Sequence, residues 1–332
     1  MELIRNKMYE IEAATLSKYA FLSKNTRGRE RKIEESDVRT EFMRDRDRIV
    51  HSKSFRRLKD KTQVFLNPVG SHYRTRLTHT MEVSQIARTI AKALLLNEDL
   101  TEAVALGHDL GHTPFGHAGE RAINAHVPFE HNRQSLRIVE KLENGTGLNL
   151  TWEVRDGILN HKKKLRPHTL EGMAVNLADR IAYLNHDLDD AARAGFLHLE
   201  DLPKDCIEIL GDTNSRRINT MILDVIRMSQ DRDWLYMSPE VSQATDKLRD
   251  FMFEAVYIDS PAKKEERKVQ TIIDLLFEYY QANVDRLPEQ GKAHIEEDGL
   301  DICIADYISG MTDRFAVTTF EELYVPQAWT ML

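Results

Sequence analysis

Residues 107–117 read GHDLGHTPFGH, a stretch that combines three histidines and one aspartate with the helix-breaking residues glycine and proline. A short apolar segment, residues 102–108, leads into it and has the composition of a helix that the loop at 111–116 ends. Around it, seven of the chain's 13 histidines fall between residues 72 and 131. Because histidine is the commonest metal ligand and titrates near neutral pH, the cluster indicates a chemical site next to helices.

On both sides of this stretch, apolar residues recur at the three- and four-residue spacing of amphipathic helices. Val83, Ile86 and Ile90, for example, fall on one face of a helix expected over residues 79–96. Further helices are expected over residues 102–108, 169–194, 217–228, 241–255, 269–283 and 300–311. The best strand candidate is 62–66, followed by the turn sequence at 67–70. The sequence therefore predicts an all-α fold with room for one short β-hairpin.

The composition limits the classes of protein. No run of 18 apolar residues occurs in the 332-residue chain, so we expect no membrane span. The N-terminal residues carry charge in every turn and lack the apolar centre of a signal peptide. Cys206 and Cys303 are the only cysteines, so we expect no disulfide framework and a cytoplasmic location.

Basic residues gather in two places, although the formal net charge is −8. One is residues 27–61, where acidic residues are interleaved, and the other is 162–164 together with Arg166. Two interpretations stand: solvated helix faces, or attraction of a polyanion such as a nucleoside triphosphate or single-stranded nucleic acid. An acidic chain with local basic zones favours a small phosphorylated ligand over a dedicated DNA-binding protein.

Four side chains form a candidate metal site. His79 lies near the start of one expected helix, and His108 and Asp109 lie at the end of the next. Asp179 lies within an otherwise apolar helical stretch, where a buried carboxylate needs a metal or a cationic partner. Two histidines and two aspartates suit Mg, Mn, Fe, Ni or Zn, and the ligand types alone do not choose among these metals.

The longer strings around these residues narrow the interpretation. They are RTRLTHT at 74–80, GHDLGHTPFGH at 107–117, FEHN at 129–132, ADRIAY at 178–183 and ADYISGMTDR at 305–314. The spacing of His79, His108-Asp109 and Asp179 resembles the HD superfamily of metal-dependent phosphohydrolases. The strings as a set resemble its bacterial dGTPase-type deoxynucleoside triphosphate triphosphohydrolases, in order and from about residue 26 to 325.

This resemblance implies a fold and an activity. We expect the HD-domain helical phosphohydrolase fold, with an N-terminal arm and helices at 1–40, an HD core at 41–260, and a C-terminal helical part at 261–332 packed on the same domain. The family hydrolyses a deoxynucleoside triphosphate, releasing deoxynucleoside and tripolyphosphate, and dGTP is the substrate that the resemblance favours. A divalent metal is implied as cofactor, Mg or Mn first, with Fe, Ni, Co or Zn as alternatives.

The resemblance also implies residue roles. His79, His108, Asp109 and Asp179 would hold the metal. The catalytic group would be His117 as base or water-orienting residue, Glu120 to orient its imidazole, and His112 and His131 at the α-phosphate. The substrate would be bound at its phosphates by Arg76, Arg180 and Tyr183, at the sugar 3′-hydroxyl by Asp187 and Gln63, and at the sugar and base by Arg249 and Tyr257.

Alternatives remain open at this point. The chain could instead be another HD-type phosphohydrolase, acting on a monophosphate, an alarmone or a cyclic dinucleotide, although the Gly-Tyr-Pro string of one cyclic-dinucleotide branch is absent. It could also be a nucleotide- or single-stranded-DNA-binding regulator with little turnover. A nucleotide or single-stranded DNA effector and a homo-oligomer, a tetramer or a hexamer, are expected by resemblance alone.

The other histidines and the C-terminal string carry weaker expectations. We expect His72 and His126 in loops, His186 paired with a neighbouring helix, and four histidines at the surface: His161, His168, His198 and His294. The 305–314 string matches the family, and it has a structural interpretation too, since a buried Asp–Arg pair can fix the end of a helix.

Overall fold

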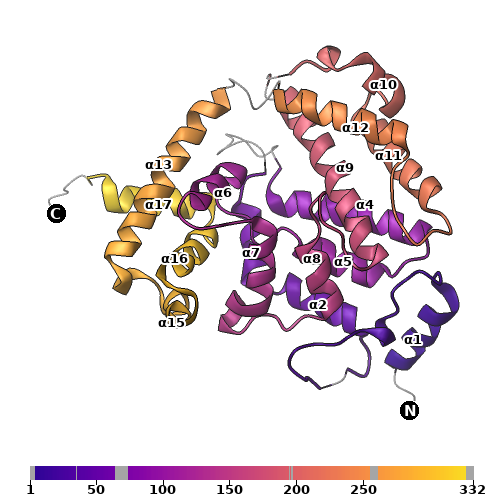
Figure 1. The fold of residues 1–332 in the computed structure, drawn as a ribbon, viewed down its shortest axis with the longest axis horizontal. Helices are drawn as coiled ribbons and strands as arrows, with labels where there is room; N and C mark the ends of the chain where they lie inside the picture. Colours follow the sequence, from indigo (N-terminus) through magenta and orange to yellow (C-terminus); the bar gives the residue numbers. More distant parts are fainter. Residues whose placement is uncertain are drawn as a thin grey trace, which may run out of the picture.

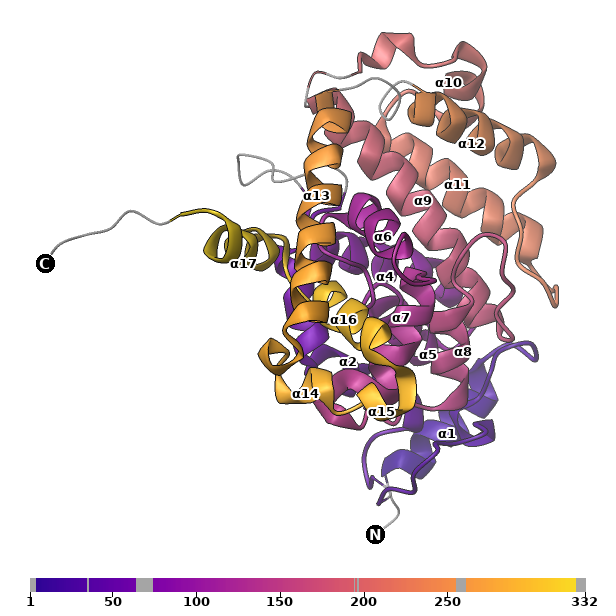
Figure 2. The same ribbon diagram turned by 60° about the vertical axis from the view of Figure 1, so that its left-hand side comes forward.

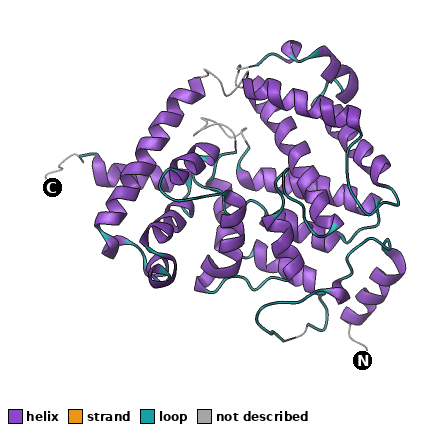
Figure 3. Ribbon diagram, viewed as in Figure 1, coloured by secondary structure: helices purple, strands orange, loops and turns teal. Residues whose placement is uncertain are grey.

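The computed structural model describes residues 4–34, 36–63, 74–193, 195, 197–254 and 261–326. Within these residues every regular element is a helix, and the one β contact is an isolated antiparallel bridge between Thr62 and Thr75 (Figure 3). The prediction of an all-α fold is confirmed. Most of the hairpin expected at 62–70 falls in 64–70, outside the described residues.

Three helices form the centre of the molecule. Helix α4 (Arg76–Ala93) packs against both α5 (Glu98–Gly107) and α9 (Leu170–Arg193) (Figure 1). Around them lie α2 (Glu41–Val50) and α8 (Trp152–Leu159), which contact α5, and α11 (Asn214–Ser229), which contacts α4 and α9.

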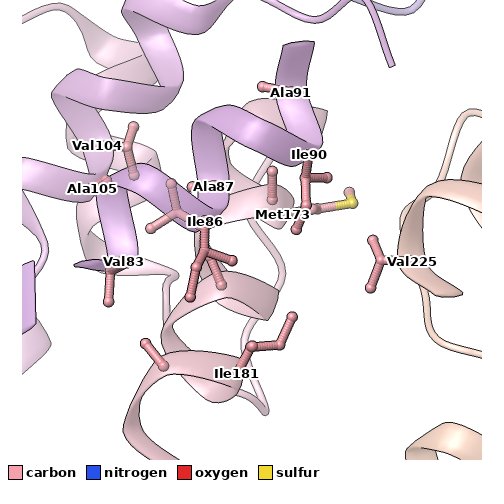
Figure 4. Close-up of a cluster of buried hydrophobic side chains, with 14 of the residues drawn as sticks. Val83, Ile86, Ala87, Ile90, Ala91, Val104, Ala105, Met173, Ile181 and Val225 are labelled. Atoms are coloured by element: carbon pink, nitrogen blue, oxygen red, sulfur yellow. The ribbon is translucent and has the colours of Figure 1, made fainter. Parts of the chain in front are cut away.

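The apolar stripe of α4 supplies the middle of the core. Its Ile86 and Ile90 are buried among side chains of the neighbouring helices, which include Val104 of α5, Ile181 of α9 and Val225 of α11 (Figure 4). The stripe predicted from sequence is thus the face on which α5, α9 and α11 assemble. Removing this apolar surface from water contributes on the order of 25 cal/mol per Å².

Side-chain caps set where the central helices begin. The Thr75 hydroxyl accepts the backbone N–H of Thr78, and the Thr78 side chain accepts the N–H of Thr75, a capping box at the start of α4. At the start of α5, Asn97 accepts the N–H groups of Asp99 and Leu100. Such caps stabilise a helix by about 1 kcal/mol and fix its first turn.

A second hydrophobic cluster joins the C-terminal helices to the histidine-rich region. Helix α13 (Pro261–Ala282) packs against α6 (Gly116–Asn124), and α16 (Leu300–Ser309) contacts both (Figure 2). Ile123, Phe277 and Ile304 are buried in this cluster, with α17 (Asp313–Tyr324) at its edge. The remaining helices are α1 (Ile4–Thr15), α3 (Lys53–Arg57), α7 (His131–Arg137), α10 (Lys204–Leu210), α12 (Pro239–Met252), α14 (Glu289–Lys292) and α15 (Ile295–Asp298).

Short turns of other helix types complete the chain. They are the 3₁₀ segments Ser23–Asn25, Leu58–Asp60, Glu143–Gly145, Leu199–Asp201 and Val284–Arg286, and a π-helical turn at Ile138–Leu142. Each helix expected from the sequence is present, with shifted ends: α4 begins three residues early, at Arg76, and α13 begins at Pro261 rather than at residue 269. No helix in the described ranges is both long and apolar enough to cross a membrane.

Candidate active site and metal centre

The four predicted metal ligands lie together. His79 comes from the first turn of α4, His108 and Asp109 follow α5, and Asp179 lies in the middle of α9. The His79 Nε2 is 3.1 Å from the Asp179 Oδ1, and the His108 Nε2 is 3.4 Å from the Asp109 Oδ1 and 3.8 Å from the Asp179 Oδ1. The packing of α4, α5 and α9 therefore brings side chains from three distant segments together, with their nitrogen and oxygen atoms facing one another.

The local bonding leaves these atoms suited to a divalent cation. The His108 Nδ1 lies 2.6 Å from the carbonyl oxygen of Ala105, so it carries the proton and its Nε2 lone pair faces the carboxylates. That Nε2 is buried and has no hydrogen-bond partner among the described residues. Burial alone would raise the pKa of Asp109, but His112, His108 and Arg76 lower it well below its usual value. An orphaned imidazole nitrogen beside ionised carboxylates fits a metal site.

Three histidines and a glutamate lie beside the metal-ligand group. The His112 Nε2 is 3.2 Å from the Asp109 Oδ1, and the His112 ring stacks on the His131 ring with centroids 4.0 Å apart. The Glu120 Oε2 is 3.0 Å from the His131 Nδ1 and 3.4 Å from the His117 Nδ1. Glu120 thus holds both rings, although the sequence assigned it only to His117. The His117 side chain is 63% exposed, so this ring faces solvent.

Glu120 is ionised by these contacts. Burial alone would raise the pKa of its carboxyl, but the hydrogen bonds from His117 and His131 hold that pKa far below its usual value. The Glu120 Oε1 also accepts the backbone N–H of His131, at 3.0 Å, which fixes the start of α7. The carboxylate therefore orients two imidazoles whose Nε2 atoms remain available for chemistry.

The glycines of residues 107–117 are needed for the close packing of this loop. A Cβ on Gly111 would lie 2.1 Å from the backbone nitrogen of Ser135, and the Ser135 hydroxyl accepts the Gly111 N–H and donates to the His108 carbonyl. Phe115 and Gly116 both have left-handed backbone angles, with φ of 63° and 57°. The loop therefore turns sharply and returns the chain into α6 with His117 beside His112.

The C-terminal string contacts this loop directly. Asp313 accepts the N–H groups of Phe115, at 2.9 Å, and Thr62, at 3.0 Å. The buried Lys61 ammonium donates to the carbonyl oxygens of His112 and Ser309, and burial lowers its pKa to about 7. Asp306, in the same string, is paired with Arg137 on α7. These contacts favour the structural interpretation of the 305–314 string: it braces the loop within residues 107–117.

Comparisons with known proteins agree with this arrangement. The family model described as the HD domain matches residues 76–184, and the phosphohydrolase-associated domain matches 235–322. A deoxyguanosinetriphosphate triphosphohydrolase-like protein of Caldanaerobacter subterraneus is 55% identical over 98% of this chain and 97% of its own. One of Clostridium perfringens is 48% identical, covering 98% of both chains. The chain belongs to the family of dGTPase-like proteins with an HD domain. It is thus an HD-type phosphohydrolase.

A solved structure supports the fold alone. The crystal structure of a phosphohydrolase from Bacteroides thetaiotaomicron aligns with a TM-score of 0.52 at 19% sequence identity, covering 81% of this chain and 66% of that one. In this dGTPase-like protein the HD domain match runs from the start of α4 into α9, and this segment contains all four predicted metal ligands.

The predicted phosphate-binding residues of the dGTPase-like chain have acidic partners. Arg76 is buried, and its Nη1 lies 3.0 Å from the Asp109 Oδ2. The Arg180 Nη2 is 2.7 Å from the Asp246 Oδ1, and Arg249 contacts the same oxygen at 3.0 Å. Tyr183, one turn after Arg180 on α9, is half-buried, and burial with the nearby Asp179 charge raises its pKa to about 12.

The described part of the chain includes Gln63 and Asp187, which were expected at the sugar, but not Tyr257, which was expected at the sugar and base. Asp187 lies two turns after Asp179 on α9, and half-buried Gln63 lies beside the loop, its carbonyl oxygen 3.6 Å from where a Cβ on Gly116 would be. Tyr257 falls outside the described residues, as does His72.

One expectation about the histidines was wrong. His161 was expected at the surface, but its residue is only 2% exposed and its ring centroid lies 5.1 Å from that of His108 and 5.4 Å from that of His131. Its Nδ1 is 2.7 Å from the carbonyl oxygen of Ile158, and burial lowers its pKa to about 3. His161 therefore lies in the site as a neutral imidazole. The four- and three-residue spacing after Val154 and Ile158, both buried on α8, was the signal that could have revealed it.

The remaining histidines lie as expected. His168 and His198 are exposed, His294 is half-exposed, and His126 follows α6 in a turn, where its Nε2 is 2.7 Å from Asp274. His186 is buried, with its Nδ1 3.1 Å from the Glu82 carboxylate on the neighbouring helix α4.

The first basic stretch is largely neutralised inside the protein. Arg29 is paired with Glu41 and Asp45, and Arg46 with three acids of α2 and α5, which are Asp47, Asp99 and Glu102. These pairs favour the interpretation of residues 27–61 as a structural charge network. The second basic stretch, 162–166, lies instead near Arg180, since Lys163 and Arg180 contact the same acid.

Proposed function

We propose that this HD phosphohydrolase hydrolyses deoxynucleoside triphosphates, with dGTP as the preferred substrate, to deoxynucleoside and inorganic tripolyphosphate. The observation that carries the proposal is the adjacency of two groups: the His79, His108, Asp109 and Asp179 set, and the Glu120-bound histidines beside it. The names of relatives that match nearly the whole chain support the same substrate class.

The four ligands would hold a divalent metal, with Mg or Mn as our first expectation and Fe, Ni, Co or Zn as alternatives. Such an ion supplies Lewis-acid withdrawal of charge from a phosphate oxygen when it is bound. The chain's own part is to fix the ligand atoms: the Ala105 carbonyl sets the His108 tautomer, and Arg76 donates to the Oδ2 of Asp109, whose Oδ1 lies nearer His108.

Two imidazoles are arranged to move protons. In the proposed reaction, the oxygen of an attacking water bonds to the α-phosphorus and the bond from that phosphorus to the 5′-oxygen breaks. His117, with its Nδ1 directed at Glu120, would take the water proton at Nε2. His131, also held at Nδ1 by Glu120, would contact the α-phosphate and give a proton to the departing 5′-oxygen, with the stacked His112 beside it.

Seven further residues would bind the parts of the substrate that extend from the metal: the phosphates, the sugar and the base. Arg76, Arg180 and Tyr183 would bind the phosphates, and Asp187 with Gln63 would bind the 3′-hydroxyl. Arg249 and Tyr257 would lie along the sugar and the base. Asp179, Arg180, Tyr183 and Asp187 follow one another along α9. This one helix would therefore contact the metal, then the phosphates and then the sugar.

A turnover panel tests the proposal. The purified protein is incubated with each of the four deoxynucleoside triphosphates and with ribonucleotide controls, with Mg²⁺, with Mn²⁺ and with chelator. We expect metal-dependent turnover of deoxynucleotides, fastest with dGTP. Absence of turnover with every deoxynucleotide contradicts the enzyme assignment, and turnover of a monophosphate, an alarmone or a cyclic dinucleotide instead assigns another HD-type reaction.

We carry three further expectations from the family: action in the cytoplasm, assembly into a tetramer or hexamer, and modulation by a nucleotide or single-stranded DNA. Light scattering coupled to gel filtration tests the assembly. Turnover measured with added single-stranded DNA or a second nucleotide tests the effector, and a gel shift that weakens steeply with salt would reveal phosphate-driven binding.

A further inference from the structure

One carboxylate oxygen in this protein is shared by three cations. The Asp246 Oδ1, on α12, lies 2.5 Å from the Lys163 Nζ, 2.7 Å from the Arg180 Nη2 and 3.0 Å from the Arg249 Nη1. The cations come from three elements: the loop after α8, α9 and α12. Lys163 belongs to the second basic stretch of the sequence, and the proposed reaction gives it no role.

In this charge network the cations outnumber the carboxylates that they contact. Arg249 has a second partner, Asp250, so three cations face two carboxylates, and all three cations meet on one oxygen atom. A carboxylate oxygen has two lone pairs, so three donors at one oxygen compete for them. Burial alone would raise the pKa of Asp246, but the Lys163 hydrogen bond and the charge of Arg180 lower it, so the carboxylate is ionised and holds the cations together.

The cluster lies next to the proposed reaction centre. Arg180 directly follows the metal-ligand candidate Asp179, and Tyr183 lies near enough to Asp179, Arg180 and Arg249 to be affected by the charge of all three. Lys163 and Arg180 also line a pocket of about 240 Å³ together with Asn176, Leu177, Trp234 and Ser242. A ligand in this pocket can therefore reach Lys163 and Arg180 without unfolding the surrounding helices.

We propose that Lys163, Arg180 and Arg249 form a polyphosphate-binding cluster, and that Asp246 is its internal counter-ion, displaced when a polyphosphate chain binds. A tripolyphosphate chain offers each cation its own oxygen atoms, whereas Asp246 offers one oxygen to all three. The inference rests on the proposed function in taking a polyphosphate as the ligand. It adds Lys163 as a binding residue and Asp246 as a competitor for the site, and it places Arg249, assigned above to the sugar and base, at the phosphate chain instead.

Binding of inorganic tripolyphosphate tests the cluster without any turnover. The full-length protein is titrated by calorimetry, with excess Mg²⁺ in cell and syringe so that chelation is the same for all variants. Lys163→Gln removes one cation, and Lys164→Gln is the matched control, since it makes the same charge change one residue away on an exposed side chain. Asp246→Asn removes the competitor.

We expect Lys163→Gln to weaken tripolyphosphate binding about tenfold, as for loss of one charge-assisted hydrogen bond, and Lys164→Gln to change it less than twofold. Asp246→Asn should tighten binding. The proposal is overturned if the wild-type protein does not bind tripolyphosphate, if the two lysine variants are equally affected, or if folded Asp246→Asn protein binds more weakly. Lys163 is half exposed, so its variant decides the question even if Asp246→Asn fails to fold.

The outcome is separable from the proposed reaction. Tripolyphosphate binding with this pattern but no hydrolysis of any deoxynucleotide would keep the cluster and reject the enzymatic assignment. Hydrolysis of deoxynucleotides with no loss of tripolyphosphate affinity in Lys163→Gln would keep the assignment and reject the cluster.

Discussion

The contact between Asp313 and the histidine-rich loop within residues 107–117 allows a quantitative prediction. Asp313 is nearly buried and accepts two backbone N–H groups, from Phe115 in its left-handed conformation and from Thr62. Asp313→Ala removes both acceptors and leaves two backbone donors without partners. At about 1.5–3 kcal/mol for each of the two hydrogen bonds to a charged group, the free energy of unfolding should fall by about 3–6 kcal/mol.

The same change should lower turnover more than it lowers metal content. The loop carries His112 and leads into His117, while Asp109 and His108 are held by α5 and by Ser135. A displacement of catalytic groups by about 1 Å can cost about a hundredfold in rate. We therefore expect kcat to fall ten- to a hundredfold with the metal-to-protein ratio unchanged.

The assay combines urea unfolding, kcat and elemental analysis on the folded protein. Asp285→Ala is the control, because the Asp285 side chain is 83% exposed and its ion pair with Arg286 is long, at 3.9 Å. Asp313→Asn should be intermediate, since its amide oxygen can accept only one of the two N–H groups well. An Asp313→Ala protein as stable and active as the control would refute the bracing role.

Other predictions follow from the site and the core. Asp179→Ala should lose bound metal and at least about a thousandfold in turnover, whereas Asp187→Asn should raise KM and keep the metal; equal metal loss in both, by elemental analysis, would refute that division. His161→Leu should lower kcat about ten- to a hundredfold, while His168→Leu at the surface should not, and equal activities would place His161 outside the chemistry. Burial raises the pKa of Glu171 to about 7 from 4.5, so the folded state binds its proton more tightly than the unfolded state does, and stability should fall by about 3 kcal/mol as pH rises from 4.5 through 7. Urea unfolding should show a lower free energy of unfolding at pH 8 than at pH 5 for the wild type, and this loss should be absent from Glu171→Gln. The same loss in both proteins would refute the assignment to Glu171.

Local spacing accounts for what the sequence predicted well. The stripe of Val83, Ile86 and Ile90 indicates a helix because its period is a property of neighbouring residues, and the structure buries that stripe in the core. The metal-ligand candidates came from residue types and their places on the expected helices, with a family resemblance in residue order, and the structure brings those four side chains within a few ångströms.

Long-range partners could not be predicted in the same way. The hydrogen bond from Phe115 to Asp313 joins residues 198 positions apart, and the sequence around either residue does not indicate that the other is its partner. The three cations around Asp246 come together only when α9, α12 and the loop after α8 are packed, so the sequence analysis did not single out this residue. Short polar helices such as α2 were missed because their burial follows from tertiary contacts, as with the buried Asp45 that binds Thr151.

The central claim is the bond that is broken, and product analysis in labelled water tests it most directly. dGTP is incubated with the protein and a divalent metal in H₂¹⁸O, and the products are identified by phosphorus NMR and mass spectrometry. We expect equal amounts of deoxyguanosine and tripolyphosphate, with one ¹⁸O in the tripolyphosphate and none in the nucleoside. Pyrophosphate with dGMP, orthophosphate with dGDP, or label in deoxyguanosine would contradict the account.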